Sequence, residues 1–581
     1  MKKYKPYLKK YWYCFLLGPL FKIIEAFGEF ILPYINANMI DIGAANGDIP
    51  YILENGLYML VFAVIMLISG VAGGYFAIKG ASRLSAGVRS DIFRKVQTFS
   101  FSNIDDFTTG SLITRITNDV TQIQEFVGTM FRGMFRAPVM LIGAIIMSFA
   151  INPELARVLI IVVPVLIGII AFIIFTAAPR YTAMQTQIDR LNVDIQETVT
   201  NEKVIKSFVR EEYEKEKFSE VNMELVDKSI HALEMMLFLG PASTLAVNAT
   251  TLAVVWFAGK QIMIGSMQIG ELTAFITYLS QILQALNFIA NIVLRGVRAA
   301  ASDKRISAVL DAKVELNDDG VTDSSLAPRN GSITFDHVTF RYFKKNREKV
   351  LNDVSFSVKA GEMVGIIGPT GSGKTTLVSM IPRLYDTDEG GVLVDGHNVK
   401  EYPLEKLRES VAIVLQKNTL FSGTVAENLR WGNENATEEQ IIHAAKIAQA
   451  DSFIRELPDG YETEVVQGGQ NLSGGQKQSI CIARALLKKP QILILDDSTS
   501  AVDTATDASI RKALRKELKG ITKIIIAQRI NSVIDADKII VMDGGEITGI
   551  GKHADLMKSC QAYQEIFWSQ KDKDEEAGHA E

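Results

Sequence analysis

The chain has 581 residues, of which 48% are hydrophobic and 22% are charged. This length exceeds a single typical domain, and so apolar a composition favours a protein with a membrane part. The 61 Lys and Arg and the 66 Asp and Glu leave a formal net charge of −5, which argues against a nucleic-acid-binding protein that relies on phosphate contacts. The three cysteines, Cys14, Cys481 and Cys560, are too far apart in sequence to indicate a disulfide scaffold or a zinc site.

The apolar stretches are concentrated in the first half of the chain. Four windows there carry no charge and are near the roughly 20 residues that a helix needs to cross a bilayer. They cover residues 56–78, 158–179, 235–259 and 272–294. A shorter uncharged window covers 138–151, and an apolar segment at 11–35 is interrupted by Lys22, Glu25 and Glu29. We predict six transmembrane helices, because a soluble protein with buried helices would rarely collect several such windows in one region.

The charges that flank these windows predict the orientation in the membrane. The first ten residues carry five lysines, whereas no Lys or Arg occurs between Lys22 and Lys79. Positive residues are enriched on the cytoplasmic side, so we expect the N-terminus in the cytoplasm. The two long connections on that side, 79–125 and 180–234, are charged and poor in Gly and Pro, which predicts helices that extend beyond the membrane. We therefore expect a multi-pass protein of the plasma (inner) membrane.

The composition changes after residue 310. Residues 311–330 are small and polar, which predicts a linker. Beyond it, short β-branched runs alternate with helical patterns, as in an α/β domain. These runs cover 331–335, 363–367, 391–394, 492–495, 521–526 and 538–541. We predict a multi-domain membrane protein with an all-α six-helix transmembrane domain at 1–310, an α/β domain at 331–570, and a charged, disordered tail at 571–581.

A candidate phosphate-binding loop follows the run at 363–367. Its residues are Gly368, Pro369, Thr370, Gly371, Ser372, Gly373, Lys374, Thr375 and Thr376. They match G-x-x-x-x-G-K-[ST] between a strand and a helix, where the glycines let backbone N–H groups surround phosphate oxygens. We expect Lys374 to reach the β and γ phosphates of a nucleotide and the Thr375 hydroxyl to bind Mg²⁺. The run at 492–495 ends in Asp496, a second candidate to hold Mg²⁺ through its water shell.

A further motif lies between these two segments. It consists of Asn471, Leu472, Ser473, Gly474, Gly475 and Gln476. Together with the phosphate loop and Asp496, it resembles the ATP-binding-cassette (ABC) family, and six spans before one α/β P-loop cassette resemble its exporter half-transporters. The resemblance covers nearly the whole chain. In this family the run from Leu472 to Gln476 is the signature motif, which binds the γ-phosphate held by a second cassette, so two cassettes would stack head to tail around two ATP molecules.

The resemblance implies roles for further residues, with ATP and Mg²⁺ as cofactors. Tyr342 matches the aromatic residue that stacks on adenine. Gln416 matches the residue that links Mg²⁺ to the membrane part, and Asp503 belongs to a loop that crosses the dimer interface. The turns near 102–107 and 211–218 resemble coupling helices, of which the second would dock on the partner's cassette.

Two positions depart from the family pattern. The family has a Glu after the strand-end Asp to polarise the attacking water, whereas this chain has Asp497; it has a switch His where this chain has Gln528. Asp is one methylene shorter, and a displacement of about 1 Å can cost ~10²-fold in rate. Gln cannot take a proton as His can. We interpret the site as one that holds ATP and hydrolyses it slowly; tolerated drift in a working ATPase is the alternative. Gln467, where many exporters have Glu, is a weaker departure.

The signature motif itself is intact. The pattern therefore resembles the degenerate-site subunit of a heterodimeric bacterial multidrug-type exporter, whose partner is a second half-transporter. We expect an ATPase-driven export of amphipathic compounds, and the drug, lipid and peptide classes all fit. An ATP-gated channel or regulatory subunit is one alternative, and a homodimer with two slow sites is another.

Polar residues in two of the predicted spans share one helix face each. The last span carries Gln284, Asn287, Asn291, Arg295 and Arg298, and the first carries Lys22, Glu25 and Glu29. Such groups seldom face lipid. They indicate either a water-filled substrate path or pairing between helices that fixes the fold.

Overall fold

The chain folds into two compact units. The structure is a computed structural model, and it describes residues 2–342, 348–497 and 504–578. Unit 1 comprises 1–97 and 108–312, and unit 2 comprises 98–107 and 313–581. The boundary near residue 312 lies close to the predicted end of the transmembrane domain. The sequence did not predict that the short segment 98–107 belongs to unit 2.

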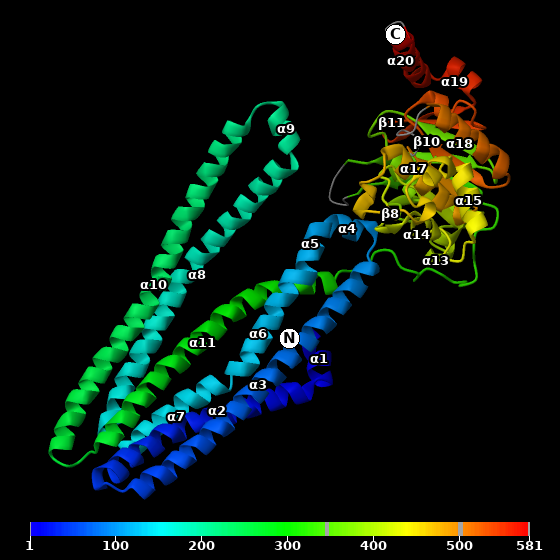
Figure 1. The fold of residues 1–581 in the computed structure, drawn as a ribbon. Coiled ribbons are helices and arrows are strands. Elements are labelled where there is room, and N and C mark those ends of the chain that lie inside the picture. Colours follow the sequence, from blue (N-terminus) through cyan, green and yellow to red (C-terminus); the bar gives the residue numbers. More distant parts are fainter. Residues whose placement is uncertain (1, 343–347, 498–503, 579–581) are drawn as a thin grey trace. The chain divides into compact units, whose positions relative to one another are not determined.

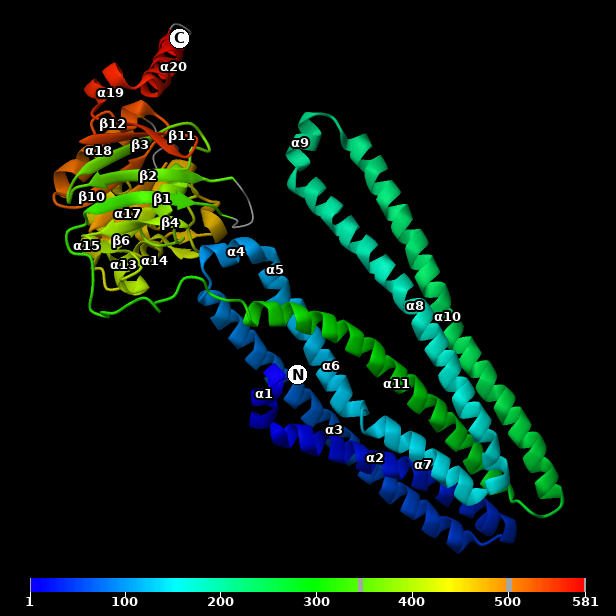
Figure 2. The ribbon, with the colours of Figure 1, turned by 180° about the vertical axis from the view of Figure 1, so that it is seen from behind.

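Unit 1 is built from long helices and a few short ones (Figure 1). They are α1 (Lys5–Lys10), α2 (Trp12–Asn38), α3 (Ile49–Gln97), α5 (Thr109–Thr114), α6 (Val120–Gly133), α7 (Arg136–Ile151), α8 (Pro153–Thr200), α9 (Glu202–Ser207), α10 (Glu211–Met263) and α11 (Ile269–Leu310). Single π-helical turns follow α2 and α5. Figures 1 and 2 show α8 and α10 side by side as an antiparallel pair joined by α9.

Four of these helical segments are long and apolar enough to cross a membrane: Ile49–Gln97, Thr109–Ile151, Pro153–Thr200 and Ile269–Leu310. Helix α2 covers nearly all of the first predicted span, and α10 contains the fifth. The helices α3, α8 and α10 run on for 48 to 53 residues, well beyond the roughly 20 that a bilayer needs. The predicted helical extensions are therefore present.

The turns between the long helices follow local chemistry. Asn152 caps α8, because its Oδ1 accepts from the backbone N–H of Glu154 at 3.0 Å and of Leu155 at 3.1 Å. Between α10 and α11 the chain reverses at Gly265, whose φ of 75° favours glycine. The second cytoplasmic turn lies at α9 and residues 208–210, so the prediction of a turn at 211–218 was a few residues late. Residues 211–218 instead form the first turns of α10, whose start is rich in Glu.

Unit 2 contains two main sheets, several strands of which are labelled in Figure 2. A four-stranded sheet has the order β2-β1-β4-β5, and a six-stranded sheet has the order β12-β11-β3-β10-β9-β6. In the latter, β11, β3, β10, β9 and β6 are parallel and β12 is antiparallel. The strands are β1 (Ile333–Phe340), β2 (Leu351–Val358), β3 (Met363–Ile367), β4 (Glu389–Val394), β5 (His397–Asn398), β6 (Val411–Val414), β9 (Ile492–Asp496), β10 (Thr522–Ile526), β11 (Lys538–Asp543) and β12 (Glu546–Gly551). The six predicted runs each overlap one of these strands.

The helices of unit 2 follow in chain order. They are α4 (Phe101–Phe107), α12 (Lys374–Ser379), α13 (Leu404–Ser410), α14 (Val425–Arg430), α15 (Glu438–Ile447), α16 (Asp451–Glu456), α17 (Gly474–Leu487), α18 (Thr504–Glu517), α19 (His553–Ser559) and α20 (Gln561–Gly578). A small sheet pairs β7 (Gly423–Thr424) with β8 (Glu464–Val465), and short 3₁₀ turns include η5 (Gln467–Gly469) and η6 (Ile530–Ser532). Strands β3 and β9 are buried at every residue, as expected for central parallel strands.

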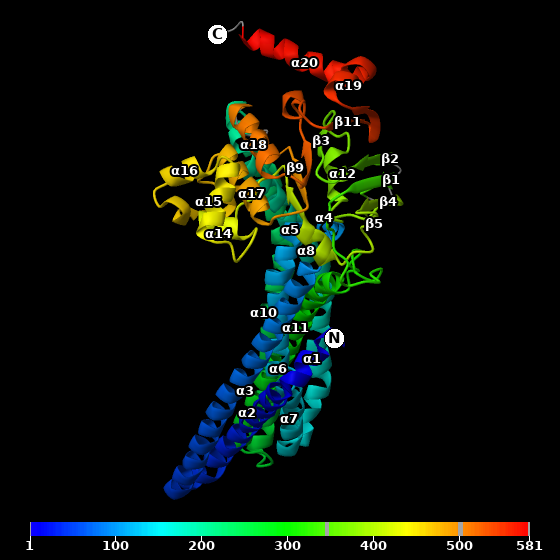
Figure 3. The same cartoon turned by 90° about the vertical axis from the view of Figure 1, so that its right-hand side faces the viewer.

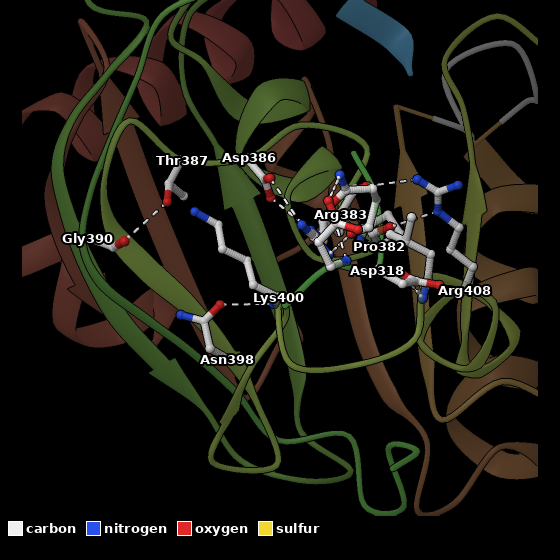
Figure 4. A network of polar contacts seen from close by, with 12 residues as sticks. Asp318, Pro382, Arg383, Asp386, Thr387, Gly390, Asn398, Lys400 and Arg408 are labelled. Carbon is white, nitrogen blue, oxygen red and sulfur yellow. Dashed lines mark hydrogen bonds and ion pairs between the residues drawn. The ribbon is translucent and has the colours of Figure 1, made fainter. Parts of the chain in front are cut away.

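Most of the predicted linker belongs to unit 2 and is held to the rest of it by polar contacts, part of which Figure 4 shows. Asp318 Oδ1 accepts from the backbone N–H of Leu404 at 3.0 Å. Arg383 donates to the carbonyl oxygen of Asn317 at 3.2 Å and pairs with Asp386 at 2.9 Å. Because Arg383 is buried, its guanidinium makes these bonds away from solvent.

The C-terminal segment differs from the prediction. Helix α20 continues to Gly578, so residues 571–578 are helical where the sequence predicted a disordered tail. Figure 3 shows α19 and α20 together at one end of unit 2. The first half of α20 is anchored by the fully buried Tyr563, with Ile566 and Phe567 packed on the same core. A helix that is nucleated by such packing extends readily into the Lys and Glu that follow, which are good helix formers.

Candidate functional site

The phosphate loop joins β3 to α12, as predicted. Gly368, Gly371 and Gly373 have φ values of 157°, 85° and 91°. A Cβ at Gly368 would lie 2.0 Å from the carbonyl oxygen of Met542, and one at Gly373 would lie 2.8 Å from that of Val350. Glycine is therefore required at both positions.

Lys374 folds back over this loop. Its Nζ donates to the carbonyl oxygens of Gly368 at 2.8 Å and Pro369 at 2.6 Å, and to Ser372 Oγ at 3.3 Å. Burial lowers the pKa of Lys374. The ammonium group is thus held at the loop by oxygen acceptors, and phosphate oxygens can take their place.

Asp496 ends β9 and contacts the start of α12. Its Oδ1 accepts from Thr375 Oγ1 at 3.0 Å. Its Oδ2 is buried and, among the described residues, has no hydrogen-bond partner. Burial raises the pKa of Asp496. A buried carboxylate oxygen without a partner, next to a threonine hydroxyl, suits a hard divalent cation, so the donor set fits Mg²⁺. Thr375 and Asp496 would hold that ion, which would neutralise phosphate charge.

Asp497 lies beside Asp496 and brings two glutamines together. It adopts a φ of 48°, and its backbone N–H donates to the carbonyl oxygen of Ile526 at 3.0 Å. Its Oδ2 accepts from Gln528 Nε2 at 2.7 Å and from Gln416 Nε2 at 3.3 Å. Burial raises the pKa of Asp497, against the effect of these two hydrogen bonds. The three residues predicted to act in catalysis therefore meet at one carboxylate oxygen.

These groups line one cavity of about 290 Å³. The lining residues are Tyr342, Val350, Thr370, Gly371, Ser372, Gly373, Lys374, Thr375, Thr376, Gln416, Asp496, Asp497, Ile526 and Gln528. Gly368 and Pro369 belong to the loop but are not among them. Tyr342 and Thr376 share a hydrogen bond of 2.8 Å between their hydroxyl groups, and the Tyr342 ring stays 39% exposed. The sequence did not identify Val350 and Ile526, because an apolar wall residue carries no motif.

The signature motif lies outside this cavity. Ser473 is the N-cap of α17: its Oγ accepts from the backbone N–H of Gln476 at 3.2 Å, and Gln476 Oε1 accepts from the backbone N–H of Ser473 at 2.9 Å. Leu472 is buried. None of the residues from Leu472 to Gln476 lines the described part of the cavity, so this pocket lacks its own chain's signature. Asp503 falls outside the described residues, and Gln467 begins η5.

Helix α4 contacts other residues of unit 2 next to this cavity. Asn103 Nδ2 donates to the carbonyl oxygen of Lys313 at 3.1 Å, and Tyr385 donates to Asp105 Oδ2 at 3.0 Å. The Tyr385 ring lies 6.0 Å from the Phe101 ring and 5.2 Å from the Tyr342 ring, between centroids. Aromatic side chains therefore connect α4 to the cavity wall, a contact that sequence spacing alone does not show.

The polar residues of the first span pair within unit 1. Lys22 and Glu25 form an ion pair at 2.5 Å, and Glu29 pairs with Arg136 of α7. Gln281 of α11 donates to the carbonyl oxygen of Glu29 at 2.9 Å. For this face, the structure favours pairing that fixes the fold.

On the last span, Gln284 lines a cavity of about 80 Å³ together with Arg136. Asn291 donates to the carbonyl oxygen of Asn287 at 3.0 Å, and the Arg298 guanidinium lies 4.8 Å from the Tyr181 ring centroid. Arg295 lies 3.8 Å from Glu125.

Three family models match the chain. Residues 15–286 match the ABC transporter transmembrane region, residues 351–500 match the ABC transporter model, and residues 434–579 match a P-loop domain. The two main matches coincide with unit 1 and with the P-loop part of unit 2.

Curated relatives and a solved structure match over nearly the full length. The chain is 37% identical to the uncharacterized ABC transporter ATP-binding protein YfiB of Bacillus subtilis (strain 168), covering 98% of both chains. It is 33% identical to an ATP-dependent lipid A-core flippase of Desulfotalea psychrophila (87% of this chain, 89% of the relative). It is also 32% identical to a putative multidrug export ATP-binding/permease protein, YgaD, of Bacillus subtilis (98% of both). A bacterial Atm1-family ABC exporter with ATP bound matches at 25% identity with a TM-score of 0.81, covering 97% of this chain and 98% of the other.

The phosphate loop, the strand-end carboxylate and the signature helix occupy the expected places of a P-loop ATPase that follows a helical membrane domain. The predicted fold class and the predicted ABC-type ATPase are therefore confirmed. The protein is a multi-pass membrane protein with its ATPase domain in the cytoplasm. The chain belongs to the ABC transporter family and is an exporter half-transporter.

Proposed function

We propose that this chain is the slow-site subunit of a heterodimeric exporter. Its own cassette holds ATP and Mg²⁺ in the cavity between Lys374 and Asp496 and hydrolyses the nucleotide slowly. Its signature motif completes a faster site on a partner half-transporter that carries Glu and His in place of Asp497 and Gln528. This partner provides most of the hydrolysis that drives export.

The observation that carries this proposal is the pair of amides on Asp497. A residue that polarises the attacking water needs carboxylate lone pairs directed at that water. Here Oδ2 accepts from both Gln528 and Gln416. A switch His would instead exchange a proton, which the Gln528 amide cannot do. Asp497 is also a methylene shorter than Glu, and an orienting group displaced by about 1 Å can lose ~10²-fold in rate.

The signature supports the second half of the proposal. The reciprocal cap at Ser473 and Gln476 starts a helix of 14 residues, α17. The first backbone N–H groups of such a helix, together with the Ser473 hydroxyl, suit a phosphate anion. A chain that only regulated a partner would have no use for this site, so the intact motif favours a transporting heterodimer over a regulatory subunit.

The substrate that we propose is an amphipathic compound. Two of the matched relatives carry the names of a lipid A-core flippase and a putative multidrug exporter, both of which point to molecules with an apolar and a polar part. The apolar helices of unit 1, with the polar residues Gln284 and Asn287 on one face of α11, offer both kinds of surface.

The experiment is an ATPase assay on the purified full-length chain in lipid nanodiscs, alone and co-purified with its partner half-transporter. We expect the chain alone to bind fluorescent mant-ATP with Mg²⁺ and to turn over ATP near background. The heterodimer should be at least about 10²-fold faster, the size of the orientation effect described above. A chain that turns over ATP as fast by itself as with its partner contradicts the proposal and favours a homodimer.

A further inference from the structure

One side chain of the C-terminal helix binds the backbone of the switch segment, which we define as residues 528–530. Gln570 of α20 donates from Nε2 to the carbonyl oxygen of Gln528 at 2.8 Å. Its Oε1 accepts from the backbone N–H of Ile530 at 2.9 Å. We propose that Gln570 is a positioning residue for the nucleotide pocket, because it holds the switch segment where the Gln528 side chain reaches Asp497.

The two bonds fix the segment in a way that one bond would not. A single hydrogen bond leaves the loop free to pivot about it, whereas a side-chain amide bound to a C=O and an N–H two residues apart sets both position and orientation. The amide has one satisfying orientation, since a flipped group would set oxygen against oxygen and N–H against N–H. Gln570 thus restrains the backbone between the end of β10 and the start of η6.

The regions on either side of the switch segment have their own restraints. Upstream, β10 is paired between β3 and β9, and Ala527 donates its N–H to the carbonyl oxygen of Ile366 at 3.2 Å. Downstream, the Ser532 hydroxyl donates to Asp507 Oδ2 of α18 at 3.0 Å. Gln570 holds the part between them, which carries Gln528.

Helix α20 is able to transmit force to this contact. Its first half is anchored by Tyr563, which is fully buried and bonded to His553 Nδ1 at 2.8 Å. Gln570 follows this anchored half and directly precedes the charged residues 571–578 of the same helix. A movement of the charged half of α20 would therefore displace the switch segment. It would also disturb Asp497, because the Gln528 amide donates to Asp497 Oδ2 at 2.7 Å.

This inference rests on the proposed function in one respect only: that nucleotide binds in the cavity lined by Gln528. It does not depend on whether the partner is a different chain. A brisk ATPase of the isolated chain would overturn the heterodimer and leave the effect of Gln570 to be measured as before.

The test uses the full-length chain in nanodiscs with three variants. Gln570→Ala removes both bonds. Gln570→Glu keeps the shape and the acceptor for the Ile530 N–H, but sets an oxygen against the Gln528 carbonyl. Gln564→Ala is the matched control, because Gln564 lies on α20 and donates at 2.9 Å to the carbonyl oxygen of Met557, away from the switch segment.

Two readouts separate positioning from general loosening. The first is backbone hydrogen exchange over residues 524–533, and the second is the release rate of mant-ATP bound with Mg²⁺. We expect Gln570→Ala to speed exchange at Ile530 and to speed mant-ATP release, by roughly fivefold for each bond lost and up to about 30-fold in all. Gln570→Glu should fall between Gln570→Ala and wild type in exchange, and Gln564→Ala should match wild type in both readouts.

A pair of truncations checks the result without a substitution. A chain that ends at Lys571 keeps Gln570 and should behave as wild type, whereas a chain that ends at Ser569 should behave as Gln570→Ala. The proposal is overturned if Gln570→Ala, with an unchanged Tm, leaves exchange and release as in wild type. Equal effects of Gln570→Ala and Gln564→Ala would also overturn it, because they would show that α20 merely stabilises the fold.

Discussion

Two regions of unit 2, the nucleotide pocket and the signature motif, differ in how closely they match the family pattern. At the nucleotide pocket, the phosphate loop is complete, but Asp497 and Gln528 replace the expected Glu and His, and two amides occupy one oxygen of Asp497. At the signature, every residue from Leu472 to Gln476 is retained and the helix cap is formed on both sides. Under the proposed function, the pocket serves this chain's own nucleotide and the signature serves the partner's. If the proposal holds, this difference means that one cassette can keep ATP binding while losing fast hydrolysis.

The largest effect should come from the signature. Gly474→Asp places a carboxylate in the first turn of α17, where the helix dipole tolerates it, so the fold is retained. The same carboxylate repels the γ-phosphate of the partner's ATP. We expect the heterodimer's ATPase rate to fall by about 10²–10³-fold, the cost of removing a key electrostatic group from an active site. Binding of mant-ATP to this chain alone should not change. An unaltered ATPase rate of the heterodimer would show that the signature motif does not contribute to the partner's site.

The second-largest effect should come from restoring the family's Glu and His in the nucleotide pocket. Asp497→Glu combined with Gln528→His lengthens the carboxylate and supplies a group that exchanges protons. We expect ATP turnover at this chain's own site to rise by about 10²-fold or more, the value of a correctly placed base. Single-turnover hydrolysis by the heterodimer measures it, with each single substitution as control. No gain in the double variant, with normal ATP binding, would place the cause of slow turnover elsewhere.

A moderate effect should come from Tyr342, whose substitution tests how the nucleotide pocket binds ATP. Tyr342→Ala removes the ring that we expect to stack on the adenine and should weaken ATP binding by about tenfold, since stacking on an aromatic ring contributes roughly 1–3 kcal/mol per base. Tyr342→Phe keeps the ring and loses only the 2.8 Å bond to Thr376, so it should cost less than about fivefold. Titration with mant-ATP distinguishes them, and equal losses would exclude stacking as the main contribution.

The smallest effect concerns Asp496 and pH. Burial raises the pKa of Asp496, so the native state disfavours its ionised form. This penalty is absent below the pKa of the unfolded chain and reaches its full size once the pH has risen through the folded pKa. Asp496→Asn removes the penalty and, without Mg²⁺, should raise Tm at neutral pH by about 2 °C, which corresponds to roughly 0.5–1 kcal/mol.

The same substitution has a built-in control. The gain in Tm should shrink as the pH is lowered into the acidic range, where the wild-type carboxyl is protonated as well. It should also reverse when Mg²⁺ and ATP are added, because Asn lacks the charge that holds the ion. Thermal melts of the full-length chain check both; a gain that does not depend on pH would point to packing.

Much of the pocket was predictable because its chemistry is local in sequence. The phosphate loop needs glycine where φ is positive and a Lys and Thr at the start of a helix, and Asp496 needs a strand that ends in a carboxylate. Parallel strands β3 and β9, separated by β10, then place both at the same edge of the sheet. Four of the six predicted spans were likewise visible as uncharged windows of suitable length, whereas 138–151 is shorter and 11–35 is interrupted by charged residues.

The features that were missed depend on contacts between distant residues. The sequence predicted a turn near 102–107 but not that it belongs to unit 2, because this depends on contacts such as that of Tyr385 with Asp105, 280 positions away. The charge of residues 571–578 suggests disorder, but the packing of Tyr563 starts a helix that carries them. Gln570 is one glutamine among many, and only the fold brings it to Gln528.

The most direct test of the central claim follows the γ-phosphate in each cassette. The co-purified heterodimer is loaded with azido-ATP that carries a radioactive γ-phosphate, allowed one turnover, and cross-linked by light. We predict that the label stays on this chain, beside Lys374, and is lost from the partner. Equal loss of label from both chains would contradict the account.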